Sequence, residues 1–131
     1  MQYGGSQDTK QGNLGTFVDT SDKEQVELFF SCRKLLDLDS MSKSDPQVRL
    51  YYKTKQGWKL TGKTELIKDN LNPNFVKSVC LDYIFEIQQL FKVHVVDVDD
   101  FKNDNNFDSI GEAEFELGEL MGSKNNMLIL N

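Results

Sequence analysis

Apolar residues recur at every second position along most of this chain, and this period of two constrains its fold more than any other feature. Four stretches show it most clearly: VELFFSC (26–32), PQVRLYYK (46–53), LFKVHVVDV (90–98) and IGEAEFEL (110–117). Alternation of this kind is typical of half-buried β-strands, because successive side chains of a strand point to opposite faces. The sequence therefore predicts a protein built from β-strands.

Three further segments bring the predicted strands to seven: WKLTGKTEL (58–66), FVKSVCLDY (75–83) and NMLIL (126–130). Gly57 marks a turn before the first of these, and LGELMGS (117–123) suits a short helical turn. Seven short strands with little helical periodicity indicate an all-β protein, an antiparallel β-sandwich.

The first 22 residues are rich in Gly, Ser, Gln, Asp and Thr and carry few bulky apolar side chains. We therefore expect a flexible tail at 1–22 and one folded domain at 23–131, with LGTFVD (14–19) as a candidate extra strand. No apolar stretch approaches the ~20 residues that span a bilayer, and no signal peptide is recognisable at the start. Cys32 and Cys80 lie in apolar runs, as buried reduced cysteines do, so we expect a cytoplasmic protein.

The net charge of −6 argues against a general nucleic-acid binder. The negative charge is also unevenly distributed along the chain. Without the five aspartates of the next paragraph, the chain has 16 acidic residues (21 minus 5) and 15 basic residues, so its charge is nearly balanced. The excess charge is therefore local, which points to a site rather than to a generally acidic surface.

Two acidic loops supply these five aspartates. LLDLDSMSKSDPQV (35–48) holds Asp39 and Asp45, and VVDVDDFKNDNNFDSIGE (95–112) holds Asp97, Asp99 and Asp108. Loops that are distant in sequence can meet at one end of a sandwich. Ca²⁺ takes about six to eight oxygen ligands, many of them carboxylates, so the two loops together suit a calcium site. Either loop alone is equally typical of solvated surface, and the lack of a Cys/His cluster disfavours zinc.

Two other uses of DVDD (97–100) fit less well. An EF-hand loop starting at Asp97 would have Lys102 at its glycine position and Asp108 where a glutamate is needed, without flanking helices. A magnesium-dependent phosphatase or sugar-nucleotide transferase would need an alternating α/β scaffold. The single histidine, His94, lies mid-strand on the polar face, where we expect a surface group rather than a base. With no glycine-rich phosphate loop or Ser-His-Asp set, we do not expect an enzyme.

Five short motifs, in order, make the chain resemble a C2 domain, the calcium-dependent lipid-binding sandwich. They are an Asp, an Asp-Pro, an Asn-Pro-aromatic, an Asp-x-Asp and an Asp before an apolar-Gly pair; the last four lie in SKSDPQVRL, LNPNF, VVDVDD and DSIGEAEFEL. The chain is most similar to the first C2 domain of copine, through SCRKLLDLDSMSKSDP and FEIQQLFKVHVVDVDD. This resemblance implies an eight-stranded sandwich of C2 type. Either LGTFVD supplies the eighth strand, or one sheet edge stays open and invites another chain.

The resemblance also implies a ligand set. By position, the side-chain ligands are Asp39 and Asp45 from the first loop and Asp97, Asp99 and Asp108 from the third loop. The backbone carbonyls of Leu38 and Val98 are the expected additional donors. Because Asp108 comes nine positions after Asp99, Asp104 or Asn105 remains an alternative to Asp108.

The implied function is calcium-dependent recruitment from the cytoplasm to anionic membranes, with phosphatidylserine or phosphoinositides as the lipid. Apolar loop residues would contact the membrane, namely Met41, Phe101 and Phe107, and lysines of two strands would bind anionic lipid, namely Lys53, Lys55, Lys59 and Lys63. Packing within the loop and ordinary solvated lysines are the alternative interpretations of these residues. The competing class is a calcium-independent module that binds protein partners, which the five retained acids argue against.

Overall fold

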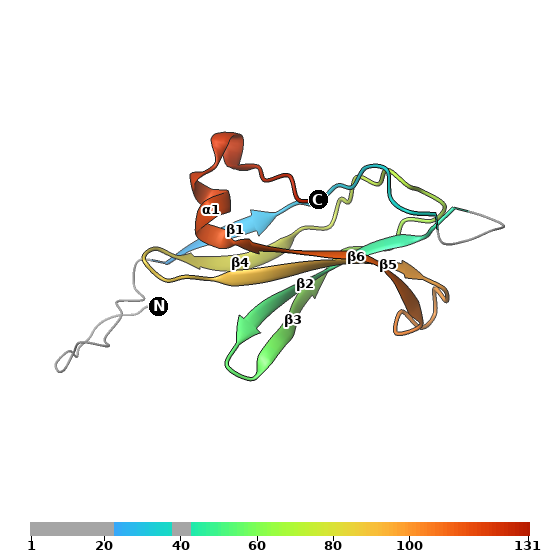
Figure 1. The fold of residues 1–131 in the computed structure, drawn as a ribbon, viewed down its shortest axis with the longest axis horizontal. Helices are drawn as coiled ribbons and strands as arrows, with labels where there is room; N and C mark the ends of the chain where they lie inside the picture. The colour runs from blue at the N-terminus through green and yellow to red at the C-terminus, as the bar shows by residue number, and fades with distance from the viewer. Residues whose placement is uncertain (1–22, 38–42) are drawn as a thin grey trace.

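A computed structural model describes residues 23–37 and 43–131. Its strands are β1 (Lys23–Leu28), β2 (Pro46–Thr54), β3 (Gly57–Lys63), β4 (Val79–Ile84), β5 (Leu90–Val98) and β6 (Phe107–Glu116), followed by the helix α1 (Leu117–Gly122) and the 3-10 turn η3 (Lys124–Asn126) (Figure 1). None of the helices in these segments has the length and apolar character that crossing a bilayer requires. The predicted tail at 1–22, with LGTFVD, lies outside the described residues.

The strands form two antiparallel sheets. One has four strands in the order β3-β2-β5-β6, and the other pairs β1 with β4. The predicted all-β antiparallel sandwich and the short helix after β6 are therefore confirmed. The described residues hold six strands of the predicted eight, and within them β1 pairs on one edge only.

Three local predictions are wrong. The strand expected to run to Cys32 ends at Leu28, and the next side chain, Phe29, is 67% exposed. The closing segment NMLIL is not a strand, because no neighbouring strand in the described chain offers it backbone partners. Cys80 is exposed rather than buried, since the alternation of β4 turns Val79 and Leu81 inward instead.

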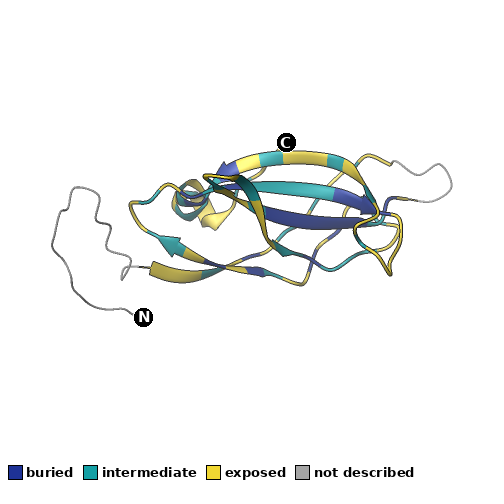
Figure 2. Cartoon of the chain, turned by 90° about the horizontal axis from the view of Figure 1, so that it is seen from below, coloured by how far each residue is buried: buried dark blue, intermediate teal, exposed yellow. Residues whose placement is uncertain are grey.

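The core lies between the two sheets (dark blue in Figure 2) and is made by the predicted alternating positions. On β5 and β6, Phe91 pairs in register with Phe115, and their ring centroids are 5.7 Å apart. The buried cluster consists of Leu28, Leu50, Val79, Leu81, Phe91, Phe115 and Leu117. An apolar groove continues from this core between the sheets, lined among others by Phe30, Val93, Val95 and Leu128.

A β-bulge changes which residues of β3 face the core. Lys53 pairs with Trp58 and Tyr51 with Leu60, but Leu50 pairs with Gly62 and leaves Thr61 as the extra residue. Gly62 therefore points inward beside the fully buried Leu50. A Cβ atom on Gly62 would lie 2.7 Å from Cγ1 of Val79 on the opposite sheet. The close approach of the two sheets at this point depends on the missing side chain.

We predict that Gly62→Ala destabilises the protein by about 1–3 kcal/mol, because the added methyl group overpacks the contact with Val79. Urea unfolding followed by fluorescence of the single Trp58 measures the change. The control is Gly111→Ala, another strand glycine, whose Cβ would meet no atom within 4 Å. Equal stability of the two variants would contradict the packing argument.

Candidate metal centre and basic sheet face

Strand register brings the predicted acidic residues to one end of the four-stranded sheet, on the right of Figure 1. Pro46 at the start of β2 is opposite Asp97 on β5, and Asp97 is opposite Asp108 on β6. The Asp97 side chain is nearly buried, and its Oδ1 accepts a hydrogen bond from the Asp45 N–H at 2.9 Å. Asp45, Asp97 and Asp108, from two distant loops, thus lie at the same sheet end.

Asp45 extends this arrangement to a third segment. Its Oδ1 accepts the N–H of Asp69, in the connection after β3, at 2.7 Å. Its backbone carbonyl accepts the N–H of Val98 at 3.0 Å. The carboxylates of Asp97 and Asp45 therefore hold together the loop before β2, the connection after β3 and the end of β5. An ionised carboxylate has further lone pairs that can bind a cation.

The third loop (99–106) is a closed, self-bonded turn rather than an extended excursion. The Asp99 N–H donates to the Asn106 carbonyl at 2.9 Å, continuing the ladder beyond β5 and β6. Inside it, the Asn103 N–H donates to the Asp100 carbonyl and the Asn106 N–H to the Asn103 carbonyl. The Asp100 side chain accepts the N–H of Lys102 at 2.9 Å. The loop thus sets the positions of Asp99 and Asp108 at its two ends.

The donor chemistry of this end fits calcium, because it consists of carboxylate oxygens without sulfur or imidazole. Within residues 23–37 and 43–131, no three acidic, histidine or cysteine side chains converge closely enough to enclose a metal. The predicted first-loop donors Asp39 and Leu38, and the predicted membrane residue Met41, lie outside the described residues. Four of the five predicted acidic ligands therefore lie in the described chain. Asp97 and Asp108 are paired in register, and Asp45 is hydrogen-bonded to Asp97.

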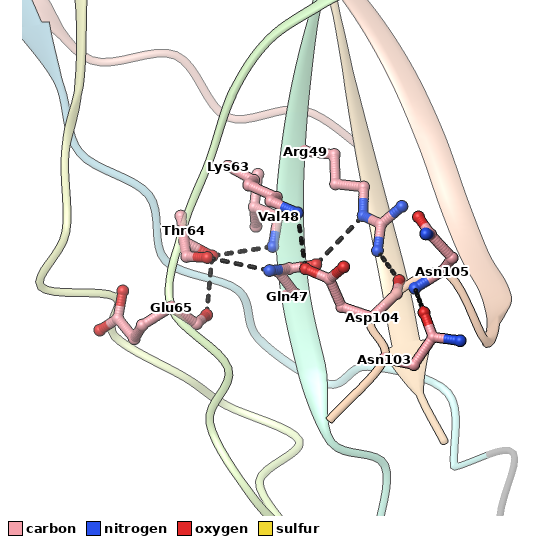
Figure 3. Close-up of polar contacts among 9 residues, drawn as sticks. All are labelled: Gln47, Val48, Arg49, Lys63, Thr64, Glu65, Asn103, Asp104 and Asn105. Atoms are coloured by element: carbon pink, nitrogen blue, oxygen red, sulfur yellow. Dashed lines mark hydrogen bonds and ion pairs between the residues drawn. The ribbon is translucent and has the colours of Figure 1, made fainter. Parts of the chain in front are cut away.

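Asp104, the alternative last ligand, has another partner. Its Oδ2 accepts a hydrogen bond from Lys63 Nζ at 2.6 Å, and its backbone carbonyl accepts one from Arg49 (Figure 3). The bond from Lys63, which outweighs the cost of desolvation, lowers the pKa of the Asp104 carboxyl below its usual value. Asp104 is thus tied to β3, whereas Asp108 is the residue opposite Asp97. Lys63 was predicted from the sequence to bind anionic lipid, and nothing in the sequence indicated its ion pair with Asp104.

The two third-loop aromatics have different surroundings. Phe101 is 51% exposed near the tip of the loop. Phe107 starts β6 and lies on the sheet, with the Arg49 guanidinium 4.3 Å from its ring centroid and the His94 ring edge-on at 5.9 Å. Phe107 therefore packs against the protein itself, and Phe101 is the exposed member of the pair.

His94 is less exposed than the sequence indicated. Its side chain is only 12% exposed, and Nε2 lies 2.8 Å from the Ser109 hydroxyl. Burial is the main reason that the pKa of His94 is lowered, and the neighbouring Glu112 carboxylate opposes this shift. His94 therefore lies on the outer face of the sheet, as predicted, but the flanking rings of Tyr51 and Phe107 partly cover its imidazole.

Register also divides the predicted lipid-binding lysines. Lys53 lies on the outer face of the four-stranded sheet, 5.1 Å from the centroid of Trp58, and exposed Lys55 lies in the turn of the β2–β3 hairpin. Lys59 pairs with Tyr52, whose ring packs on core residue Phe91 at 5.2 Å, so Lys59 is on the opposite side.

The outer face has a cation that the sequence analysis did not select. Lys92 on β5 lies 5.0 Å from the Trp58 centroid and 5.5 Å from that of Tyr51. It also approaches Glu112 at 3.6 Å. In the sequence, Lys92 lies between the apolar residues Phe91 and Val93, and this alternation could have predicted its position on the outer face. Lys53, Lys92 and Trp58 therefore form a basic face on the outer side of the four-stranded sheet.

A family model described as the C2 domain matches residues 27–130, and the chain therefore belongs to the C2 domain family. It is similar to copines. Copine-A of Dictyostelium discoideum is 44% identical over 98 residues, covering 74% of this chain and 16% of that protein. Copine-D of the same organism is 37% identical over 107 residues, covering 77% of this chain and 20% of that protein.

A solved structure, BON1-C2B, matches with a TM-score of 0.61 at 27% identity, over 82% of this chain and 75% of that one. These matches confirm the predicted resemblance to a copine-like C2 domain. The chain spans a fifth or less of the length of the two copines.

The ion pair with Lys63 gives a prediction for pH. Because the folded-state pKa of Asp104 is lowered, the pair contributes stability above the unfolded-state pKa and loses it as pH falls through the folded-state pKa. A carboxyl-carbon NMR titration should give Asp104 a midpoint below that of an ordinary aspartate, and Lys63→Met should raise this midpoint. An unchanged midpoint in the variant would contradict the assignment of Lys63 as the cause.

Proposed function

We propose that this chain is a calcium-dependent phospholipid-binding module that recruits its protein from the cytoplasm to anionic membranes. The observation that carries the proposal is the register of Asp97 directly opposite Asp108, with Asp45 bonded to the Asp97 side chain. Like charges directly opposite one another on paired strands destabilise a sheet. A bound divalent cation would remove this cost, so the close placement of Asp97, Asp108 and Asp45 is explained if it serves to bind a cation.

In this proposal the acidic residues hold the ion, and its positive charge supplies both neutralisation and open coordination positions for lipid phosphate. Asp45, Asp97, Asp99 and Asp108 would be the ligands within the described chain, together with Asp39 and the carbonyls of Leu38 and Val98. Without the ion, the same carboxylates repel an anionic membrane surface. The loop end therefore binds lipid only when its charge is offset.

The exposed Phe101 would enter the interface between headgroups and acyl chains, since its ring is the apolar group nearest the loop tip. The basic face would add attraction for anionic headgroups, with phosphatidylserine or phosphoinositides as candidates. Each lysine near an anionic leaflet contributes about 1 kcal/mol, and this attraction weakens as salt rises. Two surfaces of one sheet would then contribute to membrane binding.

We expect the wild-type chain to pellet with phosphatidylserine vesicles in calcium and to remain in the supernatant with a chelator. Asp99→Asn combined with Asp108→Asn should abolish the calcium-dependent fraction, because two carboxylate ligands are lost. The matched control, Asp82→Asn with Glu119→Gln, removes the same charge from exposed positions away from the loops. Equal pelleting with and without calcium would reject the proposal and favour a calcium-independent interaction module.

The basic face gives a separate prediction. Lys92→Met should weaken partition onto phosphatidylserine vesicles by up to about fivefold, the effect of about 1 kcal/mol, because the nearby Glu112 carboxylate offsets part of the lysine charge. Lys59→Met should have a smaller effect, because Lys59 lies on the other side of the sheet. Vesicle titration at fixed calcium measures both. A larger effect at Lys59 would support the lysines selected from sequence over the face defined by register.

A further inference from the structure

We propose that Lys63 is a positioning residue for the candidate calcium site, because its ion pair with Asp104 fixes the third loop (99–106) against β3. This inference rests on the proposed function, since it concerns how the same site is held ready for the ion. Lys63 is at the C-terminal end of β3 and Asp104 is in the loop between β5 and β6, so the contact joins two segments 41 residues apart.

The geometry of the contact is specific. Lys63 Nζ lies 2.6 Å from Asp104 Oδ2, and the two side chains are 38% and 28% exposed. Both are therefore partly shielded from solvent, where an ion pair is worth more than at a fully exposed position.

A buried polar network also holds the same loop residue (Figure 3). Arg49, only 5% exposed, donates from its terminal nitrogen to the Asp104 carbonyl and from Nε to Gln47 Oε1 at 3.1 Å. Gln47, 3% exposed, donates in turn to the Thr64 carbonyl at 3.1 Å. The Thr64 hydroxyl accepts the N–H of Val48. Asp104 is thus held through its side chain by Lys63 of β3 and through its backbone by Arg49 of β2, and Arg49 is in turn held by Gln47.

Asp104 lies between the two predicted ligands of the loop, Asp99 and Asp108. Its neighbour Asn103 donates to the Asp100 carbonyl and accepts the N–H of Asn106, so these turns join the middle of the loop to both of its sides. Ordering a free loop when an ion binds costs conformational entropy, so a loop fixed beforehand binds more tightly. The ion pair should therefore raise calcium affinity without contacting the ion.

The β-bulge at Thr61 makes the contact possible. With uninterrupted alternation, Lys63 would pair with Val48 and point into the core. The extra residue shifts the register, so Lys63 pairs with Arg49 on the outer face, the side on which Asp104 lies. The same shift turns Gly62 toward Val79. The position of Lys63 is thus tied to the packing of the two sheets.

Charge alone predicts the opposite result, which makes the inference testable. Lys63 is a cation close to a cation site, so its removal should tighten calcium binding if only electrostatics matters. Its removal should weaken calcium binding if it positions the loop. Lys63→Met keeps most of the apolar stem and removes the charge, and therefore separates the two effects by sign.

The experiment is calcium titration by calorimetry on the whole chain, without lipid. Lys63→Met should bind calcium about three- to fivefold more weakly than wild type, as the loss of a partly shielded ion pair implies. Lys63→Arg, which keeps the donor, should restore most of the affinity. The control is Lys102→Met, which removes a cation from an exposed position of the same loop and should bind calcium as tightly as wild type or more tightly.

A second background sharpens the test. In the Asp104→Asn background the ion pair is already lost, so Lys63→Met should now tighten calcium binding. Weakening in the wild-type background and tightening in the Asp104→Asn background is the expected pattern. If Lys63→Met tightens calcium binding in both backgrounds, the positioning role is overturned and Lys63 acts only through its charge.

Hydrogen exchange in chelator separates this inference from the proposed function. The loop amides of Asp99, Asn103 and Asn106 should exchange faster in Lys63→Met than in Lys102→Met, by more than the difference in global stability of the two variants accounts for. If this occurs but the wild-type chain binds no calcium, the ion pair positions the loop and the proposed function is wrong. If wild type binds calcium and both variants exchange like wild type, the positioning inference is wrong and the proposed function stands.

Discussion

The nearly buried carboxylate of Asp97 is the group on which the loop end of this domain depends. Burying a charge is costly unless hydrogen bonds compensate, and the Asp97 side chain accepts the N–H of Asp45. Asp45 in turn accepts the N–H of Asp69. These two carboxylates add to the backbone hydrogen bonds that continue beyond the strands, such as Val98 N–H to the Asp45 carbonyl, so three loops keep fixed relative positions. The residues proposed to bind calcium also build the frame of the site.

Acidic residues in the third loop have two separate tasks. Asp99 and Asp108 stand at the ends of the loop, near the pair of β5 and β6, while Asp104 is turned toward Lys63 and Arg49. The surplus of negative charge near residue 100 is therefore not a single ligand cluster. Part of it is balanced by cations of the neighbouring strands, and part is left for the candidate metal centre.

Much of the fold could be predicted because one property, alternation, acts within each strand. Leu50, Phe91 and Phe115 occupy alternating apolar positions of their strands, and they form part of the core. Two of the predictions that failed lacked support from alternation. NMLIL alternates poorly and has no strand beside it in the described chain, and Cys80 has the opposite parity to its buried neighbours. The C2 family assignment came from ordered motifs at loop ends, where chemistry rather than packing selects the residues.

The sequence by itself determined most of the strands, the order of the acidic motifs and the C2 class, because these follow from local periodicity and residue type. Only the tertiary structure decided which side chains meet across strands. Alternation assigns Lys59 and Lys63 to the same side of β3, yet the bulge at Thr61 places them on opposite sides. A single extra residue reverses every later side chain of a strand, and its presence is fixed by pairing with β2 and by the approach of Gly62 to Val79. Contacts of that kind exist only once the sheets have packed.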